Sequence, residues 1–513
     1  MPYALSACQM RRIERSAMDS GRVTGLELMS LAGQGAAACI LRFAASMRGG
    51  LNRATILCGP GNNGGDGYVV AGSLKRSGMD VGVYEMPSRG RSGDASEMRR
   101  IWLESGPTER LEKFSGAPSG EKSILVDALF GTGLARPVGG DVVEALNSSN
   151  RFDAFAALDM LSGVDSDTGE FLASGASPGM KPDLVIAFEA PKIGHYLGEG
   201  GWRRGRLDVV PIGLDEELAG LAASEPVAKA LERSEIPISR AFGKSGGKHK
   251  YEYGHLLVVA GGAGRGGAAR LAARSALRTG AGLVTVGACR DALAEHASQL
   301  NAEMLARIGS AAELRRVLRD KRINALCLGP ALGKGGVARK MALEALAHRR
   351  PVVLDADALA IFAGDVETLA KAVDGPVVLT PHEGEFANLF PDLSIENRKL
   401  AGLSKLDAVR RSAARSGSTV LLKGASTVIS DPDGRAFILA SVGDSAKPWL
   451  ATAGAGDSLC GVIAALLARG ASAVEAAAYG AWLHAEAGRV AGPGMIAEDI
   501  PEAVAEVFRE MNL

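Results

Sequence analysis

Short apolar runs alternate with amphipathic segments along the first part of the chain. Each run has the length of a β-strand, and segments with a helical pattern such as DASEMRRIWLESG and DVVEALNSS lie between them. This alternation predicts an α/β fold with a doubly wound parallel sheet, in which ligands bind at the carboxyl ends of the strands. The runs are ATILC (Ala54–Cys58), VGVYEM (Val81–Met86), SILVDALF (Ser123–Phe130), AFAALD (Ala154–Asp159) and LVIAF (Leu184–Phe188).

The pattern lapses between about residues 211 and 250 and then starts again. The intervening stretch is polar and punctuated by Pro and Gly, which is typical of a connection between domains. A second α/β series follows, through HLLVVAGG, GLVTVGA, ALCLGP, PVVLDADAL, PVVLTPHEGEF and TVLLKGAS. We therefore predict a first domain over 1–220, a linker over 221–245 and a second domain over 246–513.

Composition narrows the class of protein. The 513 residues include 58 Lys and Arg and 58 Asp and Glu, so the chain lacks the net positive charge of a protein that binds nucleic acid or an anionic membrane. We find no apolar run of membrane-spanning length and no signal peptide at the N-terminus. The six cysteines are scattered without a CxxC pair, as in a reducing compartment. We expect a cytoplasmic protein.

The stretch GPGNNGGDG after the first apolar run contains a formal GxGxxG, at Gly59, Gly61 and Gly64. This pattern, with an acid about twenty residues later, is the dinucleotide fingerprint, and GGAGRGGAA repeats the glycine pattern in the second half. The loop also carries Asn62, Asn63 and Asp66, which offer more polar ligands than a phosphate needs. A carboxylate at Asp66 would repel a phosphate unless a cation or a donor intervened.

Two further polar loops follow predicted strands. DALFGTGLARP begins at Asp127, and LDMLSGVDSDTG carries Asp159, Ser162 and Asp165. Loops at the carboxyl ends of parallel strands meet at one edge of the sheet, so the oxygen ligands of Asn63, Asp127 and Ser162 could hold one hard cation. Asp and Ser at these positions are equally typical of helix caps and turns.

These motifs, in this order, resemble the N-terminal domain of bacterial NAD(P)H-hydrate repair proteins. So do QMRRIERSAMDSG and PKIGHYLGEG, and the resemblance covers about residues 6–215. It implies a Rossmann-like epimerase that interconverts the R and S forms of the hydrated nicotinamide ring, with Asp159 moving protons. It implies potassium held by Asn63, Asp127 and Ser162. The substrate site would comprise Asn62, Asn63, Gly64, Gly65, Asp66, Gly131, Thr132, Gly133, Leu134, Ala135, Arg136, Pro137 and Asp159.

ATAGAGDSLCG is the most informative stretch of the second half. A glycine-rich turn that opens a helix presents backbone N–H groups to an anion, and a carboxylate beside it can accept the proton of an attacking hydroxyl. Asp457 occupies that position, although an acid is favourable in the first turn of any helix. The Walker A pattern GxxxxGK[ST] is absent from the sequence.

This loop resembles the GxGD motif of ribokinase-like kinases. With GPALG, LDADAL, TPHEGEF and LLKGAST, about residues 245–505 resemble the ADP/ATP-dependent NAD(P)H-hydrate dehydratases of that fold. The resemblance implies ADP as co-substrate, Mg²⁺ for phosphoryl transfer, self-association, and Asp457 as general base. The implied hydrate contacts are Ala281, Gly329, His382 and Asp457, and the implied nucleotide contacts are Lys423, Gly424, Ala425, Ser426, Thr427 and Gly456.

Two of these residues have ordinary alternatives, and the chain departs from the family pattern at four positions. His382 is placed to cap the helix that follows it, and Lys423 could be a solvated loop lysine. The departures are Leu161 for Pro, Ala331 for Gly, Glu383 for Pro and Ala455 for Thr.

We predict a bifunctional metabolite-repair enzyme that acts on the small molecules NADHX and NADPHX and binds neither nucleic acid nor membranes. It would epimerise the hydrate and then dehydrate the S form with ADP. One alternative is an oxidoreductase with two NAD-binding domains. Another is a ribokinase-like small-molecule kinase fused to a ligand-binding domain.

Overall fold

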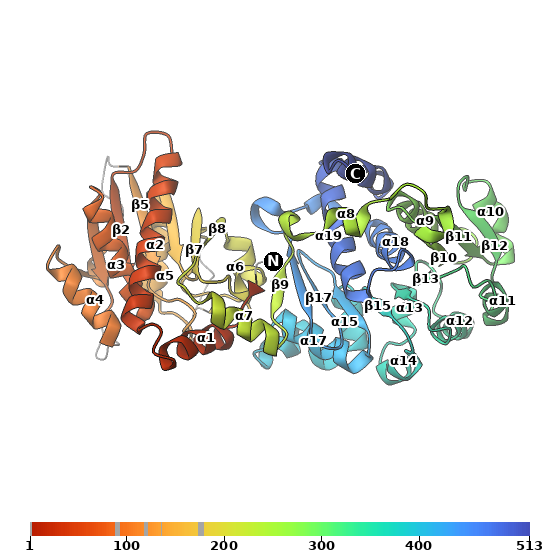
Figure 1. Cartoon of the computed structure of the whole chain (residues 1–513), viewed down its shortest axis with the longest axis horizontal. Helices are drawn as coiled ribbons and strands as arrows, with labels where there is room; N and C mark the ends of the chain where they lie inside the picture. Colours follow the sequence, from red (N-terminus) through yellow and green to blue (C-terminus); the bar gives the residue numbers. More distant parts are fainter. Residues whose placement is uncertain (1–2, 88–92, 117–121, 135, 173–178) are drawn as a thin grey trace. The chain divides into compact units, whose positions relative to one another are not determined.

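The chain divides into two compact units (Figure 1). The computed structural model describes residues 3–87, 93–116, 122–134, 136–172 and 179–513. The N-terminal unit extends to Ala228 and includes Val442–Asp444, and the C-terminal unit comprises Lys229–Ser441 and Ser445–Leu513. The boundary lies inside the segment 221–245 that we assigned to a linker, and part of that segment is a strand, β9 (Ala228–Ala230).

The sheet of the N-terminal unit is parallel throughout, as predicted, with strand order β4-β3-β2-β5-β6-β7-β8. Two strands end earlier than their apolar runs, so Leu129, Phe130 and Asp159 belong to the loops that follow. The strands are β2 (Arg53–Cys58), β3 (Asp80–Glu85), β4 (Glu109–Arg110), β5 (Ser123–Ala128), β6 (Ala154–Leu158), β7 (Leu184–Phe188) and β8 (Arg206–Val210).

Helices pack on both faces of this sheet and confirm the doubly wound architecture. Side chains of α1 (Ala7–Asp19), α2 (Gly25–Ser46), α3 (Asn62–Arg76) and α4 (Gly93–Leu103) form the core on one face. On the other face, α5 (Gly140–Asn147) contributes Val142 and Leu146 to a second core. Strands β5, β6 and β7 are buried along their whole length, which fixes the positions of the loops at their carboxyl ends.

Helix α2 corrects one expectation from the sequence. By length and composition alone it could cross a membrane, because its alanines and leucines give it a high mean hydropathy and it carries few charges. Half of its most apolar window is buried in the fold, where the helix packs on α3 and against β7 and β8. That burial is typical of a core helix of the N-terminal unit.

The C-terminal unit is built on a mixed sheet with strand order β9-β18-β17-β16-β15-β14-β13-β10-β11-β12. Strands from β12 to β16 pair in parallel, whereas β17 and β18 form an antiparallel ribbon that the sequence analysis did not predict. The parallel strands are β10 (His255–Val259), β11 (Leu283–Ala288), β12 (Met304–Arg307), β13 (Ala325–Leu328), β14 (Val352–Leu354), β15 (Val377–Leu379) and β16 (Thr419–Leu422), and the ribbon is β17 (Ser426–Ser430) and β18 (Ala436–Ala440).

Helix α18 (Ala455–Ala468) is the central core helix of this unit. It packs against α9 (Gly267–Arg278) and α19 (Ala473–Ala491), and nearly all of its residues are buried. At Gly461 the approach to α9 is so close that an added Cβ would lie 2.0 Å from the carbonyl oxygen of Ala272. The buried, tightly packed helix holds its N-terminal turn in a fixed place.

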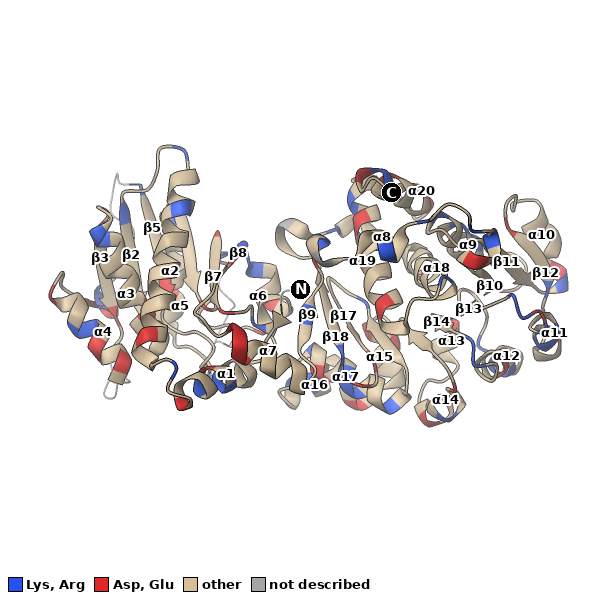
Figure 2. Cartoon of the chain, in the orientation of Figure 1, with Lys and Arg blue, Asp and Glu red and all other residues tan. Residues whose placement is uncertain are grey.

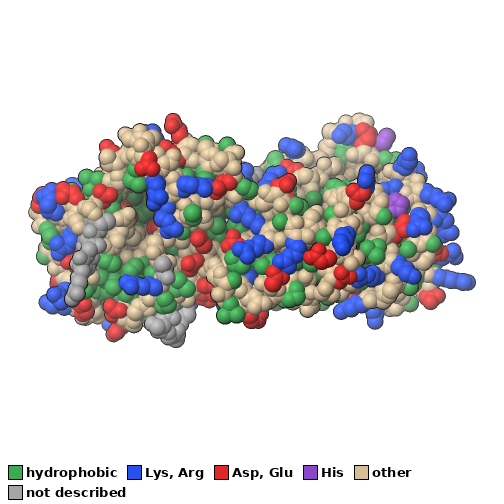
Figure 3. All heavy atoms as spheres, turned by 90° about the horizontal axis from the view of Figure 1, so that it is seen from below, with side chains coloured by type: hydrophobic (Ala, Val, Ile, Leu, Met, Phe, Trp, Pro, Cys, Tyr) green, Lys and Arg blue, Asp and Glu red, His purple; other side chains and the backbone are tan. Residues whose placement is uncertain are grey.

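Charged side chains of both signs are interspersed over the helices of both units (Figure 2). The face drawn in Figure 3 likewise mixes basic and acidic side chains. All six cysteines are free thiols, and four of them, Cys39, Cys58, Cys327 and Cys460, are buried.

Candidate active sites

The glycine motif of the N-terminal unit lies mostly inside a helix, because α3 begins at Asn62. The sequence suggested a loop here, since glycines disfavour helices. Close packing explains the glycines: a Cβ on Gly64 would lie 2.1 Å from the carbonyl oxygen of Gly59, and one on Gly59 would lie 1.7 Å from that of Leu129. The motif therefore presses the start of α3 against the loop after β5.

A cavity of about 350 Å³ opens beside this contact. Predicted site residues that line it are Asn62, Asn63, Asp66, Gly131, Thr132, Gly133, Leu134 and Asp159. Gly64 and Gly65 are packed within α3, Arg136 and Pro137 are exposed away from the cavity lining, and Ala135 lies outside the described residues. The cavity lining also includes Met10, Arg11, Glu14, Phe130, Phe188 and Lys192, to which the sequence analysis gave no role.

Asp159 is held as a buried carboxylate. Its Oδ1 is 2.9 Å from the Nζ of Lys192, and its Oδ2 accepts hydrogen bonds from the backbone N–H (2.7 Å) and the hydroxyl of Thr132. Burial alone raises the pKa of Asp159, but Lys192 and the Thr132 donors outweigh it and lower the pKa below its ordinary value. The backbone of Asp159 has φ +58°, a left-handed conformation that costs a non-glycine residue about 1–3 kcal/mol.

Lys192 is buried, and its Nζ contacts three oxygen atoms. Besides the Asp159 carboxylate, its Nζ donates to the carbonyl oxygens of Phe188 and Ala190, each at 3.0 Å. His195 fixes the same loop: its Nδ1 accepts from the N–H of Lys192 at 2.8 Å, so its Nε2 donates to the carbonyl oxygen of Asp159 at 2.8 Å. Burial lowers the pKa of His195 to about 3, which keeps the ring neutral.

Asp127 and Ser162 come together as the spacing allowed. The Ser162 hydroxyl donates to Asp127 Oδ1 at 2.6 Å, and the Ser162 N–H donates to Asp127 Oδ2 at 2.8 Å. These bonds hold the loop despite Leu161, which is buried in the core on that face. Burial raises the pKa of Asp127 to about 6, opposed by the Ser162 bonds. Asn63 lies nearby with both amide atoms buried and without a hydrogen-bond partner among the described residues.

In the C-terminal unit the glycine turn opens α18 as predicted. Gly454 precedes the helix with φ +91°, and Asp457 lies in the first turn. His484 of α19, which the sequence analysis missed, contacts the same turn: its Nε2 is 2.9 Å from the carbonyl oxygen of Ala455. Burial lowers the pKa of His484 to about 4, so the ring is neutral and donates to that oxygen.

Lys423 is not a solvated loop lysine. Its Nζ is 2.9 Å from Asp355 Oδ1 and 3.8 Å from Glu385 Oε2, and a Cβ on Gly456 would lie 3.5 Å from it. Burial lowers the pKa of Lys423, but Asp355 and Glu385 outweigh it and raise the pKa. Burial raises the pKa of Asp457 to about 6, with Asp355 adding to the shift and Lys423 opposing it. The turn, the ammonium and the carboxylate thus form one group.

His382 has the capping role that we considered as its alternative. It precedes α15 (Glu383–Leu389), and its Nδ1 accepts from the N–H of Gly384 at 3.0 Å and that of Glu385 at 3.3 Å. The ring is nevertheless exposed and adjoins the Lys423 group, since Lys423 N donates to the carbonyl oxygen of Pro381 at 2.9 Å. Capping and ligand contact are therefore compatible for this side chain.

Glu383, one of the departures from the family pattern, forms an ion cluster next to residues 423–427, the predicted nucleotide contacts. Its carboxylate is 3.1 Å from Arg398 and 3.3 Å from Lys405. Lys405 in turn donates to the carbonyl oxygens of Ser426 (2.8 Å) and Lys423 (3.2 Å). The cluster braces residues 423–427, whose Gly424 and Ala425 are exposed to solvent.

The loop after β13 explains another departure. Gly329 has φ +130°, and a Cβ there would lie 1.8 Å from the carbonyl oxygen of Asp355. Ala331, where the family pattern has glycine, is left-handed with φ +56°. The alanine therefore keeps the glycine conformation at a cost of about 1–2 kcal/mol.

We expect Ala331→Gly to raise the free energy of unfolding of the C-terminal unit by about 0.5–1 kcal/mol, since relief of strain exceeds the added freedom of the unfolded chain. Urea unfolding measures the change. The matched control is Ala347→Gly, at an exposed position with φ −67°, which should destabilise by a similar amount. Equal destabilisation by both variants would contradict the strain at Ala331.

Ala281, a predicted hydrate contact, lies apart from the Asp457 turn. It follows α9, and the neighbouring Thr279 accepts a 2.6 Å hydrogen bond from Arg469 at the C-terminal end of α18. Asp457 lies at the N-terminal end of that helix, roughly 20 Å away at 1.5 Å per residue. The family resemblance implied a hydrate contact at Ala281, which lies in the turn that enters β11.

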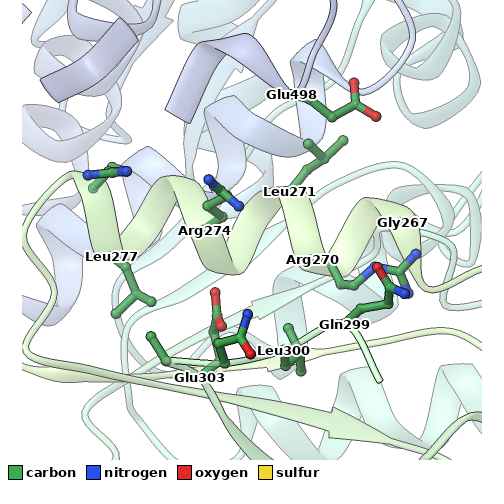
Figure 4. A pocket seen from close by; sticks show the side chains of 12 residues that line it. Gly267, Arg270, Leu271, Arg274, Leu277, Gln299, Leu300, Glu303 and Glu498 are labelled. Carbon is green, nitrogen blue, oxygen red and sulfur yellow. The ribbon is translucent and has the colours of Figure 1, made fainter. Parts of the chain in front are cut away.

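A cavity of about 690 Å³ lies along α9 in the C-terminal unit and contains none of the predicted residues (Figure 4). Arg270 and Arg274 extend from the helix, and Gln299 and Leu300 border the cavity. Its arginines are already paired: Arg270 is 3.0 Å from Glu295, Arg274 is 2.5 Å from Glu502, and Arg278 also contacts Glu502. We place no reaction there.

The geometry defines a two-site α/β enzyme, with one unit built on a parallel doubly wound sheet and the other on a mixed sheet. Residues 25–194 match the family model described as YjeF-related protein N-terminus, and residues 256–504 match the model for NAD(P)H-hydrate dehydratase. The chain belongs to the bifunctional NAD(P)H-hydrate repair enzyme family.

Relatives along the whole chain support this assignment. The chain is 32% identical to the bifunctional NAD(P)H-hydrate repair enzyme Nnr of Moorella thermoacetica, over 99% of this chain and 97% of the relative. It is 31% identical to the enzyme of the same name from Escherichia coli, over 96% and 92%. A solved structure, the ADP/ATP-dependent NAD(P)H-hydrate dehydratase of Bacillus subtilis co-crystallized with ATP/Mg²⁺, is 25% identical over 52% of this chain and 93% of its own, with a TM-score of 0.44.

Proposed function

We propose that this chain repairs hydrated NADH and NADPH in two steps. The N-terminal unit interconverts the R and S hydrates, and the C-terminal unit dehydrates the S form with ADP, releasing AMP and phosphate. The observation that carries the proposal is Asp457, set in the glycine turn of α18 beside Lys423 and Asp355, in a chain that belongs to the repair family along its full length.

In the dehydration step, the backbone N–H groups at the start of α18 and the Lys423 ammonium would bind the transferring phosphoryl group. Asp457 would take the proton of the C6 hydroxyl as its oxygen attacks the terminal phosphorus of ADP. The phosphate then leaves with the C6–O electrons, and loss of a proton from C5 restores the double bond. A carboxylate with a pKa of about 6 suits a general base near neutral pH.

The proposal includes two ions, K⁺ in the N-terminal unit and Mg²⁺ in the C-terminal unit. The buried, unpartnered amide of Asn63 beside the Asp127–Ser162 pair is an oxygen-rich set that fits potassium, which would neutralise charge near the epimerase cavity. Among the described residues there is no group of three or more His, Cys, Asp and Glu placed to hold a metal ion, so Mg²⁺ would bind chiefly through the nucleotide phosphates. Three further parts of the proposal rest on the family: a preference for ADP over ATP, self-association and a cytoplasmic location.

The test is recovery of NADH absorbance from a mixture of R and S hydrates with purified protein, Mg²⁺, K⁺ and ADP. We expect complete recovery. Recovery that stops with R hydrate left would remove the epimerase assignment. Accumulation of a stable phosphorylated product would favour a ribokinase-like kinase, and failure with both ADP and ATP would reject the dehydratase.

A further inference from the structure

The cavity of the N-terminal unit is lined by two carboxyl groups in opposite surroundings. Asp159 has Lys192 and two Thr132 donors, as described above. Asp66, on the first turns of α3, lines the same cavity and is only 8% exposed. Its carboxyl group has no hydrogen bond or ion pair among the described residues. A buried carboxylate without a partner is costly, and a buried carboxylic acid is far less so.

The charged groups around Asp66 come from three further elements. Glu14 and Arg11 lie on α1, Asp159 follows β6, and Lys192 follows β7. The Lys192 ammonium already forms an ion pair with Asp159 and donates hydrogen bonds to two carbonyl oxygens. Burial raises the pKa of Asp66 well above its ordinary value, and the negative charges of Asp159 and Glu14 add to the rise. Burial also raises the pKa of Glu14, to about 6.

We propose that Asp66 is the proton donor of the epimerase site and that Asp159 is its base partner, an inference that rests on the proposed epimerase function. The two carboxyls line one cavity from different elements, α3 and the loop after β6, so a ring bound in that cavity can contact both an acid and a base. Pairs of carboxyls held in opposite protonation states are how enzymes divide acid and base work near neutral pH.

Asp66 gives its proton to the C6 hydroxyl oxygen, the C6–O bond breaks, and water leaves while the lone pair of the ring nitrogen forms a double bond to C6. A water molecule then attacks C6 from the opposite face, Asp159 takes its proton, and the nitrogen regains its lone pair. One proton has left Asp66 and one has reached Asp159. Proton exchange with solvent then returns Asp66 to its acid form and Asp159 to its carboxylate form.

The experiment compares the wild-type chain with Asp66→Asn and Asp66→Glu. Dehydration of pure S hydrate by the C-terminal unit of the same chain reports folding and concentration. Conversion of pure R hydrate, corrected for the spontaneous rate, reports epimerisation. We expect Asp66→Asn to slow epimerisation by about 10²–10⁴-fold with dehydration of S hydrate unchanged. Asp66→Glu should restore part of the rate, and exposed Asp19→Asn should match the wild type.

Infrared difference spectra at neutral pH give a readout apart from activity. The wild type should show the carbonyl band of a protonated carboxylic acid that Asp66→Asn lacks, and its epimerisation rate should fall as rising pH removes that proton. Epimerisation by Asp66→Asn within threefold of wild type, or an ionised Asp66 at neutral pH, overturns the inference. Loss of epimerisation in the wild type itself would instead overturn the proposed function.

Discussion

Asp457→Asn should abolish recovery of NADH from the S hydrate while leaving epimerisation intact. The amide keeps the size of the side chain and the hydrogen-bonding geometry of the α18 turn but cannot accept the hydroxyl proton. Loss of a general base costs about 10²–10⁴ in rate. The measurement is single-turnover formation of NADH with saturating ADP, at pH values on both sides of the Asp457 pKa of about 6.

The wild-type rate should fall as the pH decreases through that value, because a protonated Asp457 cannot act as base. The matched control is Asp433→Asn, which makes the same chemical change at an exposed position between β17 and β18 and should leave the rate unchanged. An Asp457→Asn rate within tenfold of wild type would assign the proton transfer to another group.

Lys192→Met should destabilise the N-terminal unit by about 3–5 kcal/mol, the usual cost of removing one member of a buried ion pair. Methionine fills much of the space, but the Asp159 carboxylate and the carbonyl oxygens of Phe188 and Ala190 lose their cation. Native-state hydrogen exchange of β5, β6 and β7 measures the loss in this unit alone. The matched control, exposed Lys113→Met, should change protection little.

A second substitution separates charge from packing. Asp159→Asn in the Lys192→Met background removes the uncompensated charge, so the double variant should be more stable than Lys192→Met alone. The penalty of the single variant should also shrink as the pH falls, because the unpaired Asp159 has a raised pKa and is neutralised by protonation. Additive destabilisation by the two substitutions would show that the ion pair contributes nothing beyond packing.

The local sequence predicted where the strands and the helix α18 lie and which polar residues are found at their ends. Apolar runs located β5 and β6. Asp127 lies near the end of β5 and Asp159 directly follows β6, at the edge where a parallel sheet binds ligands. The apolar helix predicted after the glycine turn of ATAGAGD is α18, with Asp457 in its first turn. The family resemblance then supplied the chemistry that spacing left open.

What the sequence did not predict depends on contacts across the fold. Lys192 is 33 positions beyond Asp159 in the numbering, and nothing local shows that their side chains meet. The same holds for His484, which bonds to Ala455, and for Asp355, which pairs with Lys423. The glycines of α3 led us to predict a loop where the helix begins. Tertiary packing overrides their low helix propensity at this position.

The buried thiols bear on how the enzyme withstands oxidants. Cys58 ends β2 just before the glycine motif, and Cys460 lies in α18, where its sulfur is 3.5 Å from Thr380 Oγ1. Burial, with Asp355 nearby, raises the pKa values of Cys460 and Cys327 well above the ordinary range. Peroxide attacks the thiolate, so these sulfurs stay reduced where exposed, acidic thiols become sulfenic acids. The core beside the Asp457 turn is thereby protected from thiol oxidation.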